Sequence, residues 1–543
     1  MKILFISDYY LNEIVGGAEI CNDILINELK KKSCHIDALK SKNITIDVVQ
    51  KYDFVVIANF FQLSESIKYF LSTALKKKYV VYEHDHKYAS NNNPASFAGF
   101  LIDEAHIINK DFYKNALAVL AQSKMHAEII QKNLLLSNII NLGGNLWDEE
   151  KLSLLEKHST SEKTIKNAIL ETNNKNKGMI EAVQFCNKNN IQYQLLPFQK
   201  YENFIETLAK VENLFFFPQW VETFSRVSVE AKILGCKLIT NKMIGASSEE
   251  FFKFSPNQII EHLKKNNIKI VTTFLNLIND LEVEYFVPKK MPKVSIITSL
   301  YGGGEFIENF LFDITRQTIF EECELLILDA NSPDNEIEVI NKYRSGFNNI
   351  KYFKFEERLN VHQTLNKGIE YSTGDFLTIA NVDDRRTVDC LETLRKHLVY
   401  NTSIDLVYGD CLITTNKNEL VENCKSNTLY EHSVGDFSKE NMIKCLPGPI
   451  PMWKKNMSLN NGLFSEQLKF AGDWEFWLRC VKNGCTFKKV NKIVGSYYNN
   501  PAGLTTDIKN KEQKITEERQ IFVDYKEIVG YNNFEKYRFY FNV

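Results

Sequence analysis

The sequence has no long apolar run, no marked excess of one charge and no cysteines at metal-binding spacing. No stretch reaches the roughly 18 apolar residues that span a bilayer, so we expect at most peripheral membrane contact. The formal net charge of −2 gives no reason to expect a nucleic-acid partner. The eleven cysteines are odd in number and scattered, which predicts reduced, mostly buried thiols in a cytosolic protein.

A secretory leader is also not predicted at the N-terminus. The segment Met1–Asp8 reads as a first β-strand, because it is short and reaches an acidic residue too early for a signal peptide. We therefore predict a cytoplasmic location, at most at the inner face of a membrane. The composition, 44% hydrophobic and 25% charged, is typical of globular proteins, and 543 residues favour two domains.

Strand-like runs alternate with helical patterns along the chain, which predicts an α/β fold with mainly parallel sheets. Residues 286–292, which include Pro288, Lys289 and Pro292, read as a linker between a domain at 1–285 and a domain at 293–506. The tail at 507–543 is predicted to be helical and then aromatic, and to pack on the second domain. A membrane-facing or subunit interface is the alternative for this tail, because exposed aromatic patches are often interfaces.

Short apolar runs predict buried strands in both halves of the chain. They are Lys2–Ser7, Phe54–Ala58, Tyr79–Tyr82, Leu117–Ala121, Leu214–Phe217 and Lys237–Thr240, then Val294–Thr298 and Leu325–Asp329. Helical spacing is seen at Ala18–Lys31, Ser228–Leu234 and Phe306–Arg316.

Two acidic motifs in the second half carry the chemistry. The turn Asn381-Val382-Asp383-Asp384 follows an apolar strand, at the strand end where ligands collect in open α/β sheets. Asp473 follows about ninety residues later, at the start of a helix and beside Trp474. Carboxylates at the first position suit a hard divalent cation, and the second suits a proton acceptor. A helix cap is the alternative reading of Asp383 and Asp384.

In order and spacing, residues 293–506 resemble the inverting family 2 glycosyltransferases of the GT-A fold. The resemblance also rests on the Ser299–Gly304 loop, the Asp329–Asp334 turn and the Asn366–Ile369 helix. It implies a mixed, mainly parallel sheet, Asp473 as general base, and Mg²⁺ or Mn²⁺ held by Asp383 and Asp384. The nucleotide-sugar contacts that it implies are Ser299, Tyr301, Asp329, Asn366, Lys367, Asn381 and Asp383. The proline-rich loop Leu446–Trp453 resembles the segment leading to the acceptor cleft.

In the first half, Glu222 and Glu230 stand eight residues apart, a spacing that also occurs by chance. With Gly16-Gly17 and the loop Glu83–His86, they resemble family 4 retaining glycosyltransferases of the GT-B fold, which have two Rossmann-type lobes. The resemblance implies donor contacts from Gly16, Gly17 and Glu230, and catalytic positions for Glu222 and His84, without a metal.

This half departs from the family pattern in two respects. About 285 residues is short for two lobes, and the phosphate-binding Gly-Arg pair is absent. Lys177 is the residue left to clamp phosphate as a point charge, and Arg226 is a further candidate.

The prediction is thus a glycosyltransferase with one or two working sites that builds a surface polysaccharide or similar glycan. Its expected partners are a UDP-, GDP- or dTDP-sugar donor and a glycan or lipid-linked glycan acceptor, and no oligomeric state is predicted. In one alternative, only the second domain is catalytic and the first binds acceptor or is structural. A second alternative is a sugar nucleotidyltransferase, but the basic glycine-rich loop typical of that class is absent from this sequence. A third is a non-catalytic scaffold that binds nucleotide sugars, which the presence of Asp383 and Asp473 disfavours.

Overall fold

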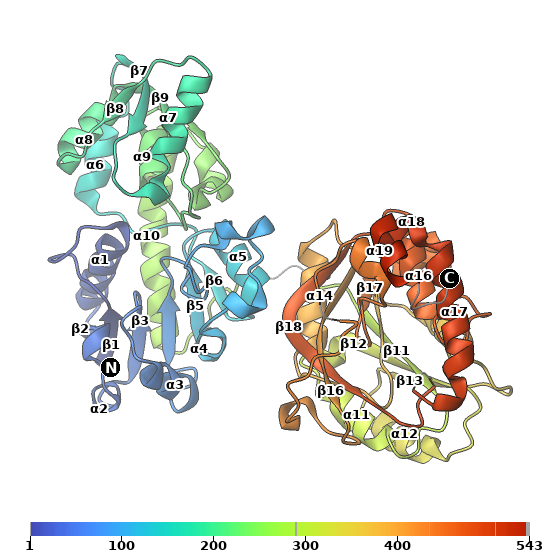
Figure 1. Ribbon diagram of the computed structural model, residues 1–543. Helices are drawn as coiled ribbons and strands as arrows, with labels where there is room; N and C mark the ends of the chain where they lie inside the picture. The colour runs from blue at the N-terminus through green and yellow to red at the C-terminus, as the bar shows by residue number, and fades with distance from the viewer. Residues whose placement is uncertain (1, 288–289, 434, 505, 539–543) are drawn as a thin grey trace. The chain divides into compact units, whose positions relative to one another are not determined.

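The computed structural model describes residues 2–287, 290–433, 435–504 and 506–538, which form two compact α/β units (Figure 1). The first unit is built from residues before 290 and the second largely from residues after it. Pro288 and Lys289 of the predicted linker, and Phe539, Tyr540 and Phe541 of the predicted tail, lie outside the described residues.

The first unit opens with a six-stranded, fully parallel sheet in the order β2-β1-β3-β4-β5-β6. The strands are β1 (Lys2–Ser7), β2 (His35–Lys40), β3 (Phe54–Ile57), β4 (Tyr79–Tyr82), β5 (Ala118–Ala121) and β6 (Ile139–Asn141). The helices are α1 (Gly17–Lys31), α2 (Ile46–Val49), α3 (Glu65–Thr73), α4 (Lys110–Asn115) and α5 (Lys124–Leu134). The central strands are buried on both faces, which is why they read as continuous apolar runs in the sequence.

A second parallel sheet of the same unit has four strands in the order β10-β9-β7-β8. Its strands are β7 (Ile165–Leu170), β8 (Gln194–Leu196), β9 (Val211–Phe216) and β10 (Lys237–Thr240). The helices are α6 (Glu149–His158), α7 (Met179–Lys188), α8 (Tyr201–Ala209), α9 (Arg226–Ile233) and α10 (Pro256–Ile278). The long helix α10 packs against α1 of the first sheet and against α6 and α9 of the second, so the N-terminal half contains two Rossmann-like sheets.

The second unit contains an eight-stranded mixed sheet in the order β13-β12-β11-β14-β17-β16-β18-β15. Its strands are β11 (Val294–Leu300), β12 (Cys323–Asp329), β13 (Ile350–Lys354), β14 (Phe376–Ile379), β15 (Arg385–Arg386), β16 (Leu406–Thr414), β17 (Met452–Lys454) and β18 (Phe487–Tyr498). The pairs from β13 to β14 are parallel, and β17 runs antiparallel to both of its neighbours. This confirms the predicted mixed, mainly parallel sheet.

Both faces of this sheet are covered by apolar side chains. Alternate residues of a strand point to opposite faces, so Leu325 and Ile327 join one buried cluster while Leu326 and Leu328 join the other. The helices are α11 (Ile307–Thr315), α12 (Glu336–Arg344), α13 (Val361–Tyr371), α14 (Cys390–Tyr400), α15 (Lys455–Asn461), α16 (Gly472–Lys482), α17 (Lys511–Asp524), α18 (Lys526–Val529) and α19 (Tyr531–Tyr537).

The helices of the tail pack on the second unit, which is the principal prediction for this segment. Ile521, Phe522 and Val529 are buried in the same cluster as Leu326 and Leu328, and the rings of Phe522 and Phe534 stack with 5.0 Å between their centroids. Within the described ranges, no helix combines the length and the apolar character needed to cross a membrane.

Candidate active site

Three parallel strands bring the predicted donor-side residues to one edge of the second unit's sheet. β11, β12 and β14 run in the same direction, so the residues that follow their carboxyl ends share that edge. Tyr301 follows β11, Asp329 ends β12, and Asn381 comes directly after β14 and its neighbour Ala380. Ser299 is half-buried near the end of β11.

The two aspartates of the acidic turn have different surroundings. Asp384 is only 2% exposed, and its carboxylate accepts hydrogen bonds from the Tyr498 backbone N–H (3.1 Å) and the Asn381 amide (2.9 Å). Burial, and secondarily the negative charge of Asp383, raise the pKa of Asp384 to about 7. Asp383 is half-buried, with one long contact from the Asn500 amide at 3.4 Å, and burial raises its pKa as well.

These residues fit a divalent cation only in part. Among the described residues, no three His, Cys, Asp or Glu side chains gather into a group that could hold a metal ion. Asp383 has an oxygen with no close partner, and Asn381 donates through its nitrogen to Asp384, which leaves its amide oxygen as a second hard donor. The turn thus offers two oxygen donors, and the oxygens of a bound diphosphate would have to complete the coordination.

Two buried arginines, Arg385 and Arg386, donate hydrogen bonds to the backbone in and beside this turn. Arg385 donates to the Val382 carbonyl (2.9 Å) and the Asp384 carbonyl (2.6 Å), and Arg386 donates to the Ile379 carbonyl. A guanidinium presents several donors in a rigid fork, so each arginine fixes the backbone that carries the acids. These arginines were not identified from the sequence, because charged residues directly after a polar turn are usually exposed.

The glycine-rich loop Gly302–Gly304 is hydrogen-bonded to the turn that follows β12. The N–H groups of Gly302, Gly303 and Gly304 donate to Ser332 (2.9 Å), Glu336 (2.8 Å) and Asp334 (3.0 Å), respectively. All three amides therefore already have acceptors in the turn after β12. Two of those acceptors are carboxylates, which would repel a phosphate at this position.

Asp329 is likewise engaged in local structure. Its carboxylate accepts the Ser332 backbone N–H (2.6 Å) and the Tyr352 hydroxyl, so the motif forms an Asx-type turn. A carboxylate accepts about four hydrogen bonds, so capacity remains on Asp329 for a ribose or base.

Tyr301 forms an exposed aromatic surface at the end of β11. It is 42% exposed, and the Arg358 guanidinium lies over its ring with 4.0 Å to the centroid. This cation–π pair offers a flat surface on which a nucleotide base could stack. Arg358 was not identified from the sequence, because it lies in the loop between β13 and α13, more than fifty residues from Tyr301.

Asn366 and Lys367 lie on α13, and both side chains have partners other than the residues of this edge. The Asn366 amide bonds the Phe464 backbone in both directions, at 3.0 Å each, and also contacts Glu466. Lys367 forms an exposed pair with Glu370 on the surface of α13. Neither residue lines the cavity described next, and their donor-binding roles remain predictions.

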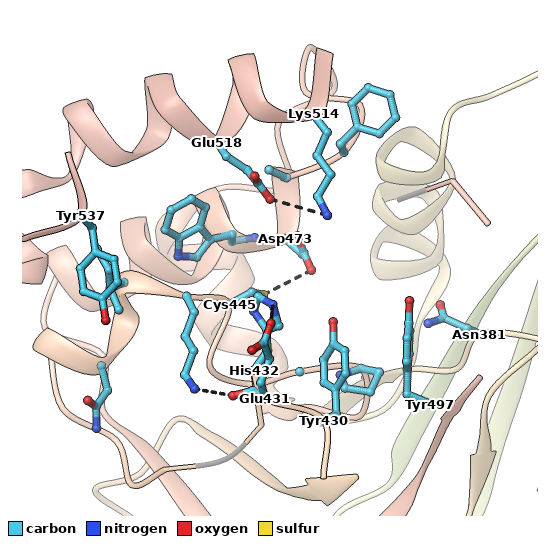
Figure 2. Close-up of a pocket in the computed structure, with 18 residues that line it drawn as sticks. Asn381, Tyr430, Glu431, His432, Cys445, Asp473, Tyr497, Lys514, Glu518 and Tyr537 are labelled. Carbon is cyan, nitrogen blue, oxygen red and sulfur yellow. Dashed lines mark hydrogen bonds and ion pairs between the residues drawn. The ribbon is translucent and has the colours of Figure 1, made fainter. Parts of the chain in front are cut away.

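A cavity of about 800 Å³ contains Asp473 (Figure 2). It is lined by Asn381 of the acidic turn, by Asp473 and Trp474 of α16, and by Gly448 and Pro449 of the proline-rich loop. Asp473 therefore faces the same space as the first residue of the acidic turn. The proline-rich loop borders this space too, and its role in acceptor binding stays a prediction.

Asp473 keeps hydrogen-bonding capacity toward the cavity. One carboxylate oxygen accepts the Trp474 backbone N–H at 2.8 Å, and the other accepts the Cys445 thiol at 3.4 Å. Each oxygen has two lone pairs, so both can still accept a proton or a substrate hydroxyl.

Gly472 explains how the sequence brings this carboxylate into place. A Cβ at this position would lie 2.7 Å from the His362 ring, so only glycine lets the start of α16 approach α13 so closely.

Aromatic and tail residues complete the walls. Tyr430 and Tyr497 are 4.6 Å apart between ring centroids and lie below Asp473 in Figure 2. Trp474 lines the cavity, whereas Trp477 is buried in the core against Trp453 (5.3 Å). The tail forms a further wall of the cavity through Lys514, Glu518 and Tyr537, and this wall was not predicted from the sequence.

In the first unit, the structure brings Lys177 and Glu222 together. The Lys177 ammonium lies 2.7 Å from the Glu222 carboxylate, at the carboxyl ends of β7 and β9. Both side chains retain exposure, 41% and 15%. The pair therefore places a cation and an acid side by side at the edge where ligands of parallel sheets bind.

Glu230 and His84 are more enclosed than a donor-contact role suggests. Glu230 is buried, accepts the Tyr201 hydroxyl at 3.0 Å, and has its pKa raised by burial. His84 contacts the side chains of Asn22 (2.8 Å) and Gln122 (2.6 Å), and burial lowers its pKa to about 3. His84 is therefore neutral at physiological pH, with both ring nitrogens engaged.

Gly16 and Gly17 begin α1, near Arg226 of α9. A Cβ on Gly17 would lie 3.6 Å from the Arg226 side chain. The Arg226 guanidinium stacks on Trp147 (3.7 Å) and donates to the Leu146 carbonyl (2.7 Å), while its other terminal nitrogen is buried and has no hydrogen-bond partner among the described residues. Arg226 thus has a free donor beside the first glycine loop.

Comparison with protein families matches residues 295–444 to Glycosyl transferase family 2. The match includes β11, β12 and the acidic turn, and it ends before Asp473. The first unit lies outside it.

Among curated proteins, an uncharacterized glycosyltransferase of Methanocaldococcus jannaschii is 22% identical over 207 residues, which cover 38% of this chain and 70% of the relative. A GalNAc(5)-diNAcBac-PP-undecaprenol beta-1,3-glucosyltransferase of Campylobacter jejuni is 26% identical over 195 residues, covering 35% of this chain and 60% of the relative. Among solved structures, residues 1–349 of S. aureus TarS align with a TM-score of 0.35 and 16% identity, covering 43% of this chain and 66% of that one.

Proposed function

Because residues 295–444 form a family 2 glycosyltransferase domain, we propose that this chain transfers a sugar from a nucleotide-sugar donor to an acceptor hydroxyl with inversion at the anomeric carbon. The observation that carries the proposal is the shared cavity, in which the Asp473 carboxylate and Asn381 of the acidic turn face the same space. A proton acceptor thus stands across from the turn that would hold the donor diphosphate.

The reaction is a single displacement. Asp473 takes the proton of the acceptor hydroxyl while its oxygen forms a bond to the anomeric carbon. The bond from that carbon to the diphosphate oxygen breaks, and the nucleoside diphosphate leaves with the electron pair. A positioned base of this kind contributes roughly 10²–10⁴-fold to the rate.

The other residues of the edge bind the donor. Asp383 and the Asn381 amide oxygen would hold Mg²⁺ or Mn²⁺, which supplies charge neutralisation for the leaving diphosphate. Tyr301 and Arg358 offer a stacking surface for the base, and Asp329 a hydrogen-bond acceptor for base or ribose. A UDP-, GDP- or dTDP-sugar is the proposed donor class.

The acceptor is proposed to be a glycan or lipid-linked glycan. The Campylobacter jejuni relative is named for action on an undecaprenol-linked oligosaccharide, which supports this class of acceptor. A cytoplasmic enzyme that meets its acceptor at the inner face of a membrane fits this proposal.

For the first unit we propose a second, metal-independent and retaining donor site of the GT-B type. Its support is the Lys177–Glu222 pair and the free Arg226 donor beside Gly17. A module that only holds acceptor or stabilises the fold is the alternative, and the enclosed positions of Glu230 and His84 favour it.

The test is nucleotide release and sugar transfer across a panel of UDP-, GDP- and dTDP-sugars, with Mn²⁺ or with EDTA. Asp473→Asn is expected to lower the metal-dependent kcat by about 10²–10⁴-fold and to leave donor binding intact, because the amide cannot take a proton. Asp436→Asn is the matched control, since Asp436 is exposed and does not line the cavity. Full activity in Asp473→Asn would refute the base assignment, and donor binding without turnover in the wild type would favour the scaffold alternative.

A further inference from the structure

Helix α17 of the tail is attached to the loop that precedes Asp473. The Glu517 carboxylate accepts backbone N–H groups from three consecutive residues, Lys469 (2.9 and 3.1 Å), Phe470 (2.8 Å) and Ala471 (3.2 Å). These residues lead directly into Gly472 and Asp473. The Glu517 side chain thus fixes the backbone just before α16, the helix that carries the proposed base. Glu517 lies 46 residues beyond Ala471 in the sequence.

A second attachment lies on the other side of Asp473. The hydroxyl of Tyr525, at the end of α17, donates to Glu475 at 2.8 Å. Glu475 is itself paired with Arg479 one turn along α16, with contacts of 2.9 Å. Along the chain, Asp473 therefore lies between two points at which the tail is bonded to the loop before α16 and to α16 itself.

The same helix also presents two charged side chains to the cavity. Lys514 and Glu518 are four residues apart, so they lie on one face of α17, and both line the space in front of Asp473 (Figure 2). Their charged ends are 3.8 Å apart, beyond hydrogen-bonding distance, which leaves donors on Lys514 and acceptors on Glu518 for a ligand.

We propose that α17 is an active-site element, in which Glu517 is a positioning residue for Asp473, and Lys514 and Glu518 contact the hydroxyl groups of the sugar acceptor. The inference rests on the proposed role of Asp473. It assigns a catalytic task to a segment that lies outside the region matched to the family.

The physical argument is one of placement. Hydrogen bonds to a charged group are stronger than those between neutral groups, and three of them on one carboxylate restrict the loop more than solvent would. A displacement of a reacting group by about 1 Å can cost roughly 10²-fold in rate. Glu517 does not itself line the cavity, so its effect must pass through the loop and appear in kcat rather than in donor binding.

The experiment uses the full chain with Glu517→Ala and Glu517→Gln, and Glu512→Ala as the matched control on the exposed side of α17. The measurements are kcat and donor KM for nucleotide release from UDP-glucose, UDP-GlcNAc and GDP-mannose with Mn²⁺. Glu517→Ala is expected to lower kcat by about 10²-fold with donor KM within twofold. Glu517→Gln should retain part of the activity, because its amide oxygen still accepts the N–H groups. An unchanged kcat in Glu517→Ala, or an equal rise in donor KM, would overturn the inference.

Hydrogen exchange separates this inference from the proposed function. Faster exchange at Lys469–Ala471 in Glu517→Ala, with the sheet unchanged, would support the positioning role even if no donor on the panel were turned over. Unchanged exchange there would overturn it. A failure of the wild type on every donor would instead count against the proposed function.

For Lys514 and Glu518, the readout is transfer to octyl β-glucoside, octyl β-galactoside and octyl β-N-acetylglucosaminide. Lys514→Ala and Glu518→Gln are expected to raise the acceptor KM by about 10-fold, because a charged hydrogen bond is worth about that factor, whereas Glu512→Ala should leave the acceptor KM unchanged. An acceptor KM within twofold of the wild-type value in both variants would refute acceptor contact.

Discussion

Asp383 and Asp384 are neighbours of the same type, yet the structure separates their roles. The sequence could predict an acidic turn at the end of a buried strand, because an apolar run followed by polar residues indicates where the strand ends. It could not predict which acid stays accessible. Asp384 is fixed by the backbone of Tyr498, which is 114 residues away, and contacts at that separation leave no local signal.

Replacing each acid in turn tests this division. Asp383→Asn is expected to remove the gain in donor affinity that Mn²⁺ provides. Outer-shell partners of a metal are already worth roughly 10–100-fold in affinity, so loss of a direct carboxylate should cost at least as much. Asp384→Asn, the same change one residue along, should keep most of the gain, since both of its oxygens are already bonded within the protein. Calorimetric titration of the donor with Mn²⁺ and with EDTA measures both, and unchanged Mn²⁺-dependent affinity in Asp383→Asn would refute its ligand role.

At the scale of elements, the buried parallel strands were the most predictable. β1, β4 and β10 have the predicted bounds, and β11 and β12 extend the predicted strands by two residues each. β16 and β18 were not predicted, although they form the longest pairing of the second unit. β18 contains polar residues such as Lys488, Asn491 and Lys492, because part of it faces solvent, and its apolar pattern is therefore interrupted.

The tail shows what composition does and does not determine. Its composition, charged and then aromatic, could predict that the segment after residue 507 packs on the second domain. It could not predict that α17 borders the cavity, because that depends on which surface receives the helix. The glycine-rich loop is a similar case, since its composition suits phosphate binding and its amides are nevertheless occupied by the turn after β12.

Glu324 gives a pH prediction for the opposite edge of the sheet. It is only 1% exposed at the start of β12, and it accepts hydrogen bonds from Lys351 (2.8 Å), Ser295 (2.6 Å) and Thr373 (2.5 Å). Burial alone would raise its pKa, but these bonds outweigh burial and hold the pKa of Glu324 well below its usual range. A carboxyl whose pKa is lower in the folded state stabilises the fold above its unfolded pKa of about 4.3.

That stabilisation is therefore lost as the pH falls below about 4. Glu324→Gln is expected to lower the free energy of unfolding by about 2 kcal/mol at pH 7, since it removes charged hydrogen bonds. The difference from the wild type should shrink in acid. Urea unfolding at pH 7 and at pH 3.5 measures both values, with the exposed Glu321→Gln as the control. A difference that stays constant or grows in acid would contradict the assignment.

At the scale of the whole molecule, two Rossmann-like sheets precede a family 2 glycosyltransferase domain in one chain. The order of predicted strands and helices was sufficient to predict two parallel α/β regions. Whether both are catalytic depends on side-chain contacts that the sequence does not reveal. In the first unit the contacts point in two directions. The side chains of Lys177 and Glu222 are partly exposed, which favours a binding site, while Glu230 and His84 are enclosed, which disfavours one.

Two variants decide whether the molecule carries one activity or two. Glu230→Gln keeps an oxygen for the Tyr201 hydroxyl but removes the charge, so the fold of the second sheet should persist. If the first unit transfers sugar, this variant should silence an activity that survives EDTA and leave the Mn²⁺-dependent activity unchanged. Asp473→Asn should silence the Mn²⁺-dependent activity and leave the activity that survives EDTA unchanged, because the Asp473 carboxylate lies in the other unit.

The measurement is nucleotide release by both variants over the donor panel, with Mn²⁺ and with EDTA. Glu212→Gln, an exposed glutamate on β9 of the same sheet, is the control for the first unit. Separate loss of two activities would establish two sites. A single EDTA-sensitive activity untouched by Glu230→Gln would assign the first unit a supporting role, which its enclosed Glu230 already favours. Loss of both activities in Glu230→Gln would contradict independence, because Glu230 and Asp473 belong to different units.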